Sequence, residues 1–153
     1  MVRCRMMILL PVLAASLASA APAGSAEPYR FVDAVAEVYK GGAVDVFART
    51  NRPLPREDEP EDDEVGRTAL GWFTLARRSP LSSSGVFRTG LPRRNCYWQT
   101  KEYKRLPPEL RPSQIGKRVR LTFRFEDGRK PIVGTALLVK PGQNSPRRLG
   151  CRK

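Results

Sequence analysis

The stretch that decides the fold is Arg118-Val119-Arg120-Leu121-Thr122-Phe123-Arg124-Phe125. Apolar and polar side chains alternate along it, and successive side chains of a β-strand point to opposite faces. The pattern therefore predicts a half-buried antiparallel strand, with an apolar inner face and an outer face that carries three arginines.

A second strand is expected to return antiparallel to this one after a turn at Asp127-Gly128. A four-residue loop would place Phe125 opposite Ile132. The same register places Val119 opposite Leu138, so that the apolar side chains of both strands share one face. The pattern thus predicts a hairpin with one buried face.

Residues 27–50 have the pattern of another hairpin, because apolar and polar residues alternate on both sides of Gly41-Gly42. A three-residue loop that ends at Gly42 places Val38 opposite Val44 and keeps one face apolar. A two-residue loop would instead place Val38 opposite Asp45. We therefore predict the three-residue loop, with a glycine in the left-handed region.

The predicted register of this hairpin has consequences for individual residues. It places Glu37 opposite Asp45, although like charges directly opposite each other destabilise a sheet. The same alternation predicts that Val32 lies on the inner face together with Ala34, Ala36 and Val38. The alternative is an amphipathic helix over 31–39, since its apolar residues also fit helical spacing. Enrichment in valine and aromatic residues favours the strand.

Further short strands are predicted at 68–77, 86–87 and 96–103. Prolines in 106–116 exclude a long helix there, and one helical turn is expected at 113–116. About six short strands with few helical segments predict an all-β domain, either a small antiparallel barrel or a sandwich. The barrel would be OB-like, that is, similar in strand count to oligonucleotide/oligosaccharide-binding barrels. This is a likeness of fold class and implies no function.

Residues 1–26 are predicted to be a secretory signal peptide. Two arginines precede an apolar run, and small residues precede candidate cleavage points after Ala20 and Ala26. The apolar run is short for a membrane span. We therefore expect a periplasmic or secreted protein that is not an integral membrane protein. Residues 27–153 are expected to form a single β-rich domain.

The cysteine and histidine contents limit the chemistry that is available. Removal of the signal peptide takes Cys4 with it and leaves Cys96 and Cys151, an even pair that predicts one disulfide in an oxidising compartment. The chain contains no histidine, which excludes histidine-dependent nucleophilic catalysis and histidine-based zinc sites. No catalytic residue, metal site or cofactor is therefore predicted.

Charge is unevenly distributed along the chain. Residues 27–64 hold five basic and eleven acidic side chains, a net charge of −6. Residues 65–153 hold 21 basic and four acidic side chains, a net charge of +17. A strongly positive segment attracts anionic polymers and acidic proteins, although it also serves solubility alone.

Residues 53–66 are predicted to be a disordered acidic loop. Seven carboxylates fall within 57–64, and prolines interrupt the surrounding sequence. Such a run repels itself and has little to bury. It lacks the glycine of an EF-hand turn, so no metal site is predicted. One hypothesis is that the loop lies against the chain's own basic face and competes there with anionic ligands.

Two groups of side chains are candidates for binding an anionic ligand. On the alternating strand, guanidinium groups on one face could follow a row of phosphates, sulfates or carboxylates. In the stretch 93–105, aromatic rings would stack on bases or sugars while cations hold the anionic groups. The alternatives are a solvated strand face and aromatic residues in the core. The candidates are Arg118, Arg120, Arg124, Arg93, Arg94, Tyr97, Trp98 and Lys101.

These observations predict a non-enzymatic envelope or secreted protein that binds an anionic partner through a basic sheet face. The partner would be a glycan, a nucleic acid or an acidic protein. The alternative is a secreted inhibitor of a hydrolase, which would insert a loop into the enzyme's cleft. A hydrolase of unfamiliar type is a third hypothesis. No oligomeric state follows from the sequence.

Overall fold

The computed structural model describes residues 24, 26–55, 71–76, 79–80, 93 and 95–152. Nearly all of the predicted signal peptide, most of the predicted acidic loop and the predicted strand at 86–87 lie outside the described residues. The strands form one sheet in the order β4-β3-β6-β7-β1-β2-β5. They are β1 (Phe31–Val38), β2 (Ala43–Thr50), β3 (Gly71–Leu75), β4 (Ser79–Pro80), β5 (Cys96–Glu102), β6 (Arg118–Phe125) and β7 (Ile132–Val139).

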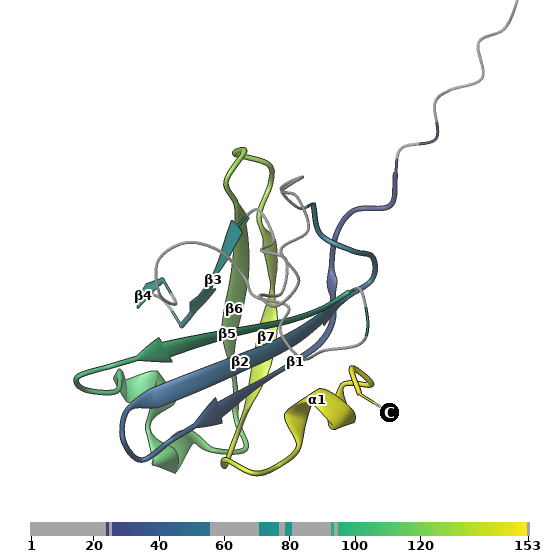
Figure 1. Cartoon of the computed structure of the whole chain (residues 1–153). Helices are drawn as coiled ribbons and strands as arrows, with labels where there is room; N and C mark the ends of the chain where they lie inside the picture. The colour runs from purple at the N-terminus through teal and green to yellow at the C-terminus, as the bar shows by residue number, and fades with distance from the viewer. Residues whose placement is uncertain are drawn as a thin grey trace, which may run out of the picture.

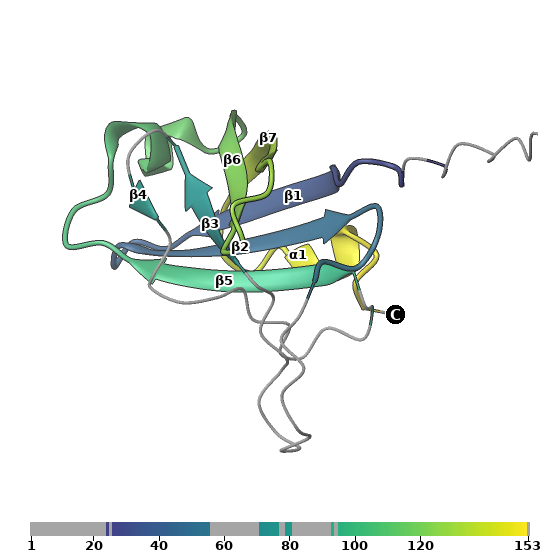
Figure 2. The same cartoon turned by 90° about the horizontal axis from the view of Figure 1, so that it is seen from above.

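The sheet curls into a nearly closed barrel. In Figure 1, β3, β6 and β7 run up the picture and β2 and β5 run across it, while Figure 2 shows β1, β2 and β5 alongside one another. At the open seam, the backbone N–H of Phe73 in β3 donates a 2.9 Å hydrogen bond to Oε1 of Gln99, a buried side chain of β5. The predicted all-β fold of about six strands is confirmed, and of its two architectures the structure is the barrel.

One pair of strands departs from the expected antiparallel arrangement. β1 and β7 are parallel, with Val35 opposite Leu137 and Glu37 opposite Val139. Parallel neighbours cannot be joined by a tight hairpin turn. Most of the chain separates β1 from β7 in sequence. Their pairing therefore joins the first hairpin, β1–β2, to the last hairpin, β6–β7. The barrel therefore assembles from two hairpins, β1–β2 and β6–β7, which meet through contacts distant in sequence.

The predicted register of the first hairpin is confirmed. Val38 lies opposite Val44, Glu37 lies opposite Asp45, and Gly42 has φ of +92°. The prediction for Val32 is wrong, because the register shifts between Phe31 and Asp33. This irregularity leaves Val32 43% exposed, while Phe31 packs against the barrel core. A bulge adds one residue to a strand, so alternation alone misassigns the residues before it.

The second hairpin forms with a register two residues away from the predicted one. Phe123, not Phe125, lies opposite Ile132. The turn begins at Phe125, whose carbonyl accepts a hydrogen bond from the Gly128 N–H, and Pro131 has no N–H to donate to the ladder. Because side chains alternate with a period of two, the shift leaves every residue on its predicted face.

The barrel interior combines aliphatic side chains with a group of aromatic rings. Phe73, Phe123 and Phe125 are buried, and the ring centroids of Phe73 and Phe123 are 5.4 Å apart. The proline-rich segment that was predicted to exclude a long helix forms two short 3-10 turns, η1 (Pro108–Leu110) and η2 (Pro112–Gln114), in place of the single turn expected at 113–116. Leu110 from η1 is buried in the same core.

A second apolar cluster lies on the outside of the barrel, beneath the C-terminal segment. The sequence did not predict the short helix α1 (Ser145–Arg148), which lies beside β1 in Figure 1. Leu149 just after it packs with Val35 and Val139. The predicted disulfide between Cys96 and Cys151 is confirmed, with a Cα–Cα distance of 5.8 Å. The outer face of this part of the sheet is therefore covered by the chain itself.

Candidate functional site

The outer face of β6 carries Arg118, Arg120 and Arg124, a set that we call the arginine face. All three side chains are exposed, whereas Leu121 and Phe123 between them are fully buried. The strand alternation that was read from the sequence accounts for this division, because the inner side chains fill the barrel. The arginine face is thus a cationic row on a rigid strand.

A small pocket of about 140 Å³ lies on part of this face, and Arg118 is not among the residues that line it. Arg120 and Arg124 line it together with the hydroxyl-bearing Thr74 and Thr122 and with Ala76. Ala76 adopts φ of 60° just after β3, and its backbone N–H donates a 2.9 Å hydrogen bond to the carbonyl of Arg120. This hydrogen bond holds Ala76 beside Arg120 at the pocket.

The three arginines differ in their ionic partners. Nη1 of Arg118 lies 3.7 Å from Oδ1 of Asp33, in a pair whose side chains are both about half exposed. Such surface pairs contribute little free energy and are screened by salt. Arg120 and Arg124 form no ion pair with any residue that the structure describes. Among the described residues, therefore, no carboxylate neutralises these two charges.

The candidate residues of β5 do not form one surface, because strand alternation places Trp98 on the outer face and Tyr97 and Lys101 on the inner face. Tyr97 is buried inside the barrel, where its Oη accepts a 2.7 Å hydrogen bond from the Leu54 N–H. Trp98 faces outward, with its ring centroid 6.5 Å from that of Phe47, and packs against the apolar cluster beneath the C-terminal segment. Lys101 lies opposite the core residue Val44, on the inner face. Tyr97, Trp98 and Lys101 therefore do not form a single stacking platform for a ligand.

Of the two remaining candidates of this stretch, only Arg93 lies among the described residues. Arg93 is exposed, and its carbonyl accepts a hydrogen bond from the Cys96 N–H just before β5. Arg94 lies outside the described residues. The arginine face is thus the part of the predicted site that the fold brings together.

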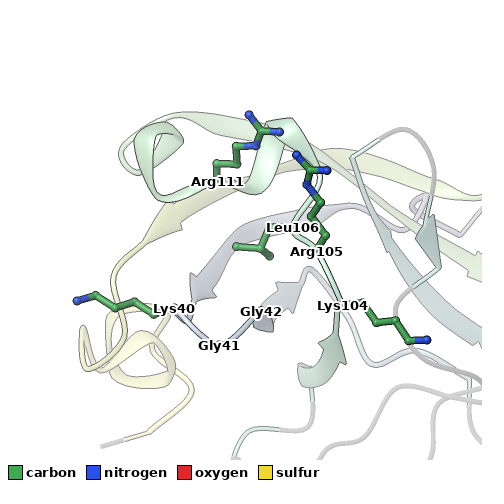
Figure 3. A pocket seen from close by; sticks show the side chains of 7 residues that line it. All are labelled: Lys40, Gly41, Gly42, Lys104, Arg105, Leu106 and Arg111. Carbon is green, nitrogen blue, oxygen red and sulfur yellow. The ribbon is translucent and has the colours of Figure 1, made fainter.

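A second cationic site, missed by the sequence analysis, lies where β1 turns into β2. This hollow of about 350 Å³, which we call the end pocket, is shown in Figure 3. Of its cations, only Lys104 and Arg105 belong to the aromatic and cationic stretch 93–105 noted in the sequence. The tertiary structure brings Lys40 and Arg111 to the same pocket. The lining residues are Lys40, Gly41, Gly42, Lys104, Arg105, Leu106 and Arg111.

Buried polar groups tie the C-terminal segment to the barrel. Oγ of the fully buried Ser145 donates a 2.6 Å hydrogen bond to Oε1 of Glu37, and the Tyr39 hydroxyl donates to Oε2 of the same carboxylate at 3.1 Å. Burial, followed by the hydrogen bond to Glu37 and the charge of Asp45, raises the pKa of Tyr39 to about 12. Because Ser145 has no exposed surface, this cluster is structural and offers no nucleophile to a substrate.

Within the described residues, no group of three or more histidine, cysteine, aspartate or glutamate side chains comes together in a way that would hold a metal ion. None of the helices in this part of the chain is long and apolar enough to cross a membrane. Comparison of the chain with protein-family models, curated proteins and solved structures finds no match.

The hydroxyl groups of Tyr97 and Tyr103 make a testable contrast. Oη of Tyr103 is buried without a hydrogen-bond partner among the described residues, so Tyr103→Phe is expected to leave stability unchanged or slightly higher. Tyr97→Phe removes the acceptor for the buried Leu54 N–H and is expected to lower stability by about 1 to 3 kcal/mol. Urea unfolding of both variants measures the difference, and an equal loss in both would contradict this account.

Unfolding at alkaline pH gives a second test of the environment of Tyr103. Burial raises the pKa of Tyr103 from 10.0 to about 12, so the folded chain holds this proton at a pH where the unfolded chain has lost it. Stability that is fully present below pH 10 is therefore expected to fall as pH rises from about 10 to about 12. Tyr103→Phe should show a smaller fall in urea-unfolding free energy over this range, with the contribution of Tyr39 remaining. An unchanged fall would contradict the assignment to Tyr103.

Proposed function

We propose that this protein is an exported, non-enzymatic module that binds a linear anionic polymer, a glycan or a nucleic acid, through the arginine face. The observation that carries the proposal is the row of three exposed arginines on one outer strand face. With a rise of about 3.4 Å per residue, the row from Arg118 to Arg124 spans about 20 Å. A single small anion cannot contact all three guanidinium groups, whereas a polymer can.

The surroundings of the arginine face support an anionic ligand. Across β6, Thr74 and Thr135 lie opposite Thr122 and Arg120, and Val133 is also on this outer face. The two threonines bring hydroxyl donors, and Asp33 beside Arg118 is the one carboxylate that forms an ion pair with the arginine face among the described residues. Guanidinium groups bind phosphate and sulfate with two parallel hydrogen bonds, which favours such groups over a simple point charge. The net charge of +17 over residues 65–153 adds a long-range attraction to polyanions.

Export to the periplasm or the exterior is part of this proposal. The disulfide between Cys96 and Cys151 fits an oxidising compartment. The predicted signal peptide at residues 1–26 gives the same location. Envelope and extracellular glycans, and nucleic acid released from cells, are the anionic polymers that an exported protein would meet.

Replacement of the arginine face tests the proposal. In Arg118→Ser/Arg120→Ser/Arg124→Ser, affinity for heparin and for single-stranded DNA is expected to fall by roughly tenfold or more at physiological salt. For DNA, the slope of log affinity against log salt should flatten by about two units, at about 0.7 per lost phosphate contact. Fluorescence anisotropy over a salt series measures both quantities.

The matched control removes the same number of charges elsewhere. Lys130→Ser/Lys140→Ser/Arg148→Ser changes three exposed cations that lie off the arginine face. It should weaken binding less than threefold and leave the salt slope nearly intact. Equal losses in the two triple variants would show that net charge alone binds the polymer. Tight binding of a hydrolase that is insensitive to salt would favour the alternative, a secreted inhibitor.

A further inference from the structure

The end pocket gathers four cations from three separate segments of the chain. Lys40 comes from the β1–β2 turn, Lys104 and Arg105 follow β5, and Arg111 lies between η1 and η2. Figure 3 shows the side chains of Arg105 and Arg111 extending to the same side, while Lys40 and Lys104 reach to opposite flanks. The cations are thus spread around the hollow.

The backbone that carries these cations is fixed by specific contacts. The Tyr103 N–H donates a 3.0 Å hydrogen bond to the carbonyl of Gly42, which joins the β1–β2 turn to the segment after β5. Leu106 packs against the barrel core. On either side of Arg111, the N–H of Leu110 and that of Gln114 close the two 3-10 turns. The pocket is therefore largely preformed, which lowers the entropic cost of binding a ligand.

The charges of the end pocket are not compensated within the described residues. No carboxylate lines the hollow, and none of its four cations forms an ion pair with a residue that the structure describes. Four like charges around one hollow repel one another, and a bound anion relieves this repulsion. The electrostatics thus favour a ligand with several negative charges.

We propose that the end pocket is a second ligand site, separate from the arginine face, for a compact molecule with at least two phosphate or sulfate groups. The volume of about 350 Å³ lies within the range of small-molecule pockets. Two guanidinium groups on one side suit one tetrahedral anion, and the lysine on each flank adds positive charge that favours further anionic groups on the same ligand. Leu106 and the glycine turn leave space for the body of the ligand.

Titration with tripolyphosphate tests this site. At physiological ionic strength, calorimetry is expected to show saturable binding to the unaltered protein, and inorganic monophosphate should bind at least tenfold more weakly. Arg105→Ser/Arg111→Ser should lower the affinity for tripolyphosphate by roughly tenfold or more, because hydrogen bonds between charged groups are lost. Sucrose octasulfate, titrated in parallel, distinguishes a phosphate from a sulfate preference; saturable binding of either polyanion that the same double variant weakens supports the site.

A charge-matched pair separates this site from the arginine face. Arg120→Ser/Arg124→Ser removes the same two charges and should change tripolyphosphate affinity less than threefold. It should weaken heparin binding, which the pocket variant largely retains, so the two proposals fail independently. Lys40→Ser/Lys104→Ser, both at exposed positions, provides a second pocket variant if the first folds poorly. Equal losses in the pocket and face variants, or no saturable binding of either polyanion, would overturn the proposal.

Discussion

Removal of the Cys96–Cys151 disulfide is expected to lower the free energy of unfolding by about 4 kcal/mol. The two cysteines are 55 residues apart in sequence, and in the chain-entropy model a closed loop of this length restricts the unfolded chain by about that amount. The loss is a large part of the stability of an ordinary domain. Urea unfolding of Cys96→Ser/Cys151→Ser against the unaltered protein measures it.

The disulfide also holds the C-terminal segment on the outside of the barrel, which gives the experiment a useful comparison. Ser145→Ala removes the hydrogen bond to the buried Glu37 from the same segment and is expected to cost about 1 to 3 kcal/mol. The double cysteine variant should therefore be the less stable of the two. If it loses less than Ser145→Ala, the polar contact and not the disulfide is the main tether.

Gly42→Ala is expected to destabilise the fold by about 2 to 4 kcal/mol, since backbone strain and a steric clash add together. The φ of +92° is one that side chains rarely adopt. A Cβ at this position would clash with the carbonyl oxygen of Tyr103, whose backbone has little freedom to move. The substitution would push apart the β1–β2 turn and the segment after β5.

The neighbouring glycine supplies the control for this substitution. A Cβ on Gly41 would meet nothing within 4 Å, so Gly41→Ala should change the free energy of unfolding by less than about 1 kcal/mol. Thermal and urea unfolding of both variants measure the contrast. Because both glycines line the end pocket, Gly42→Ala should also weaken tripolyphosphate binding if the variant remains folded. Equal stability of the two variants would show that the segment after β5 yields easily.

The sequence predicted the arginine face because the decisive information is local. Alternation from Arg118 to Phe125 has a period of two, and this period places the arginines outside whatever partner the strand finds. The same rule, applied to β5, would have separated Tyr97 from Trp98. The stretch was instead read by composition, which ignores the direction of side chains. The end pocket escaped prediction because Lys40 and Arg111 are 71 positions apart in sequence.

By itself, the sequence determined the all-β class, the two hairpins, the register of the first of them and the pairing of the cysteines. The class, the hairpins and the register follow from turn residues and a periodicity of two, which are local features of the sequence. The cysteine pairing follows because the domain contains only two cysteines. Only the tertiary structure decided the parallel pairing of β1 with β7 and the hydrogen bond from Phe73 to Gln99 that links β3 to β5 across the open seam of the barrel. It also decided the bulge at Val32 and the cover provided by the C-terminal segment. Each of these depends on the fit between surfaces far apart in the chain, and no local pattern encodes that fit.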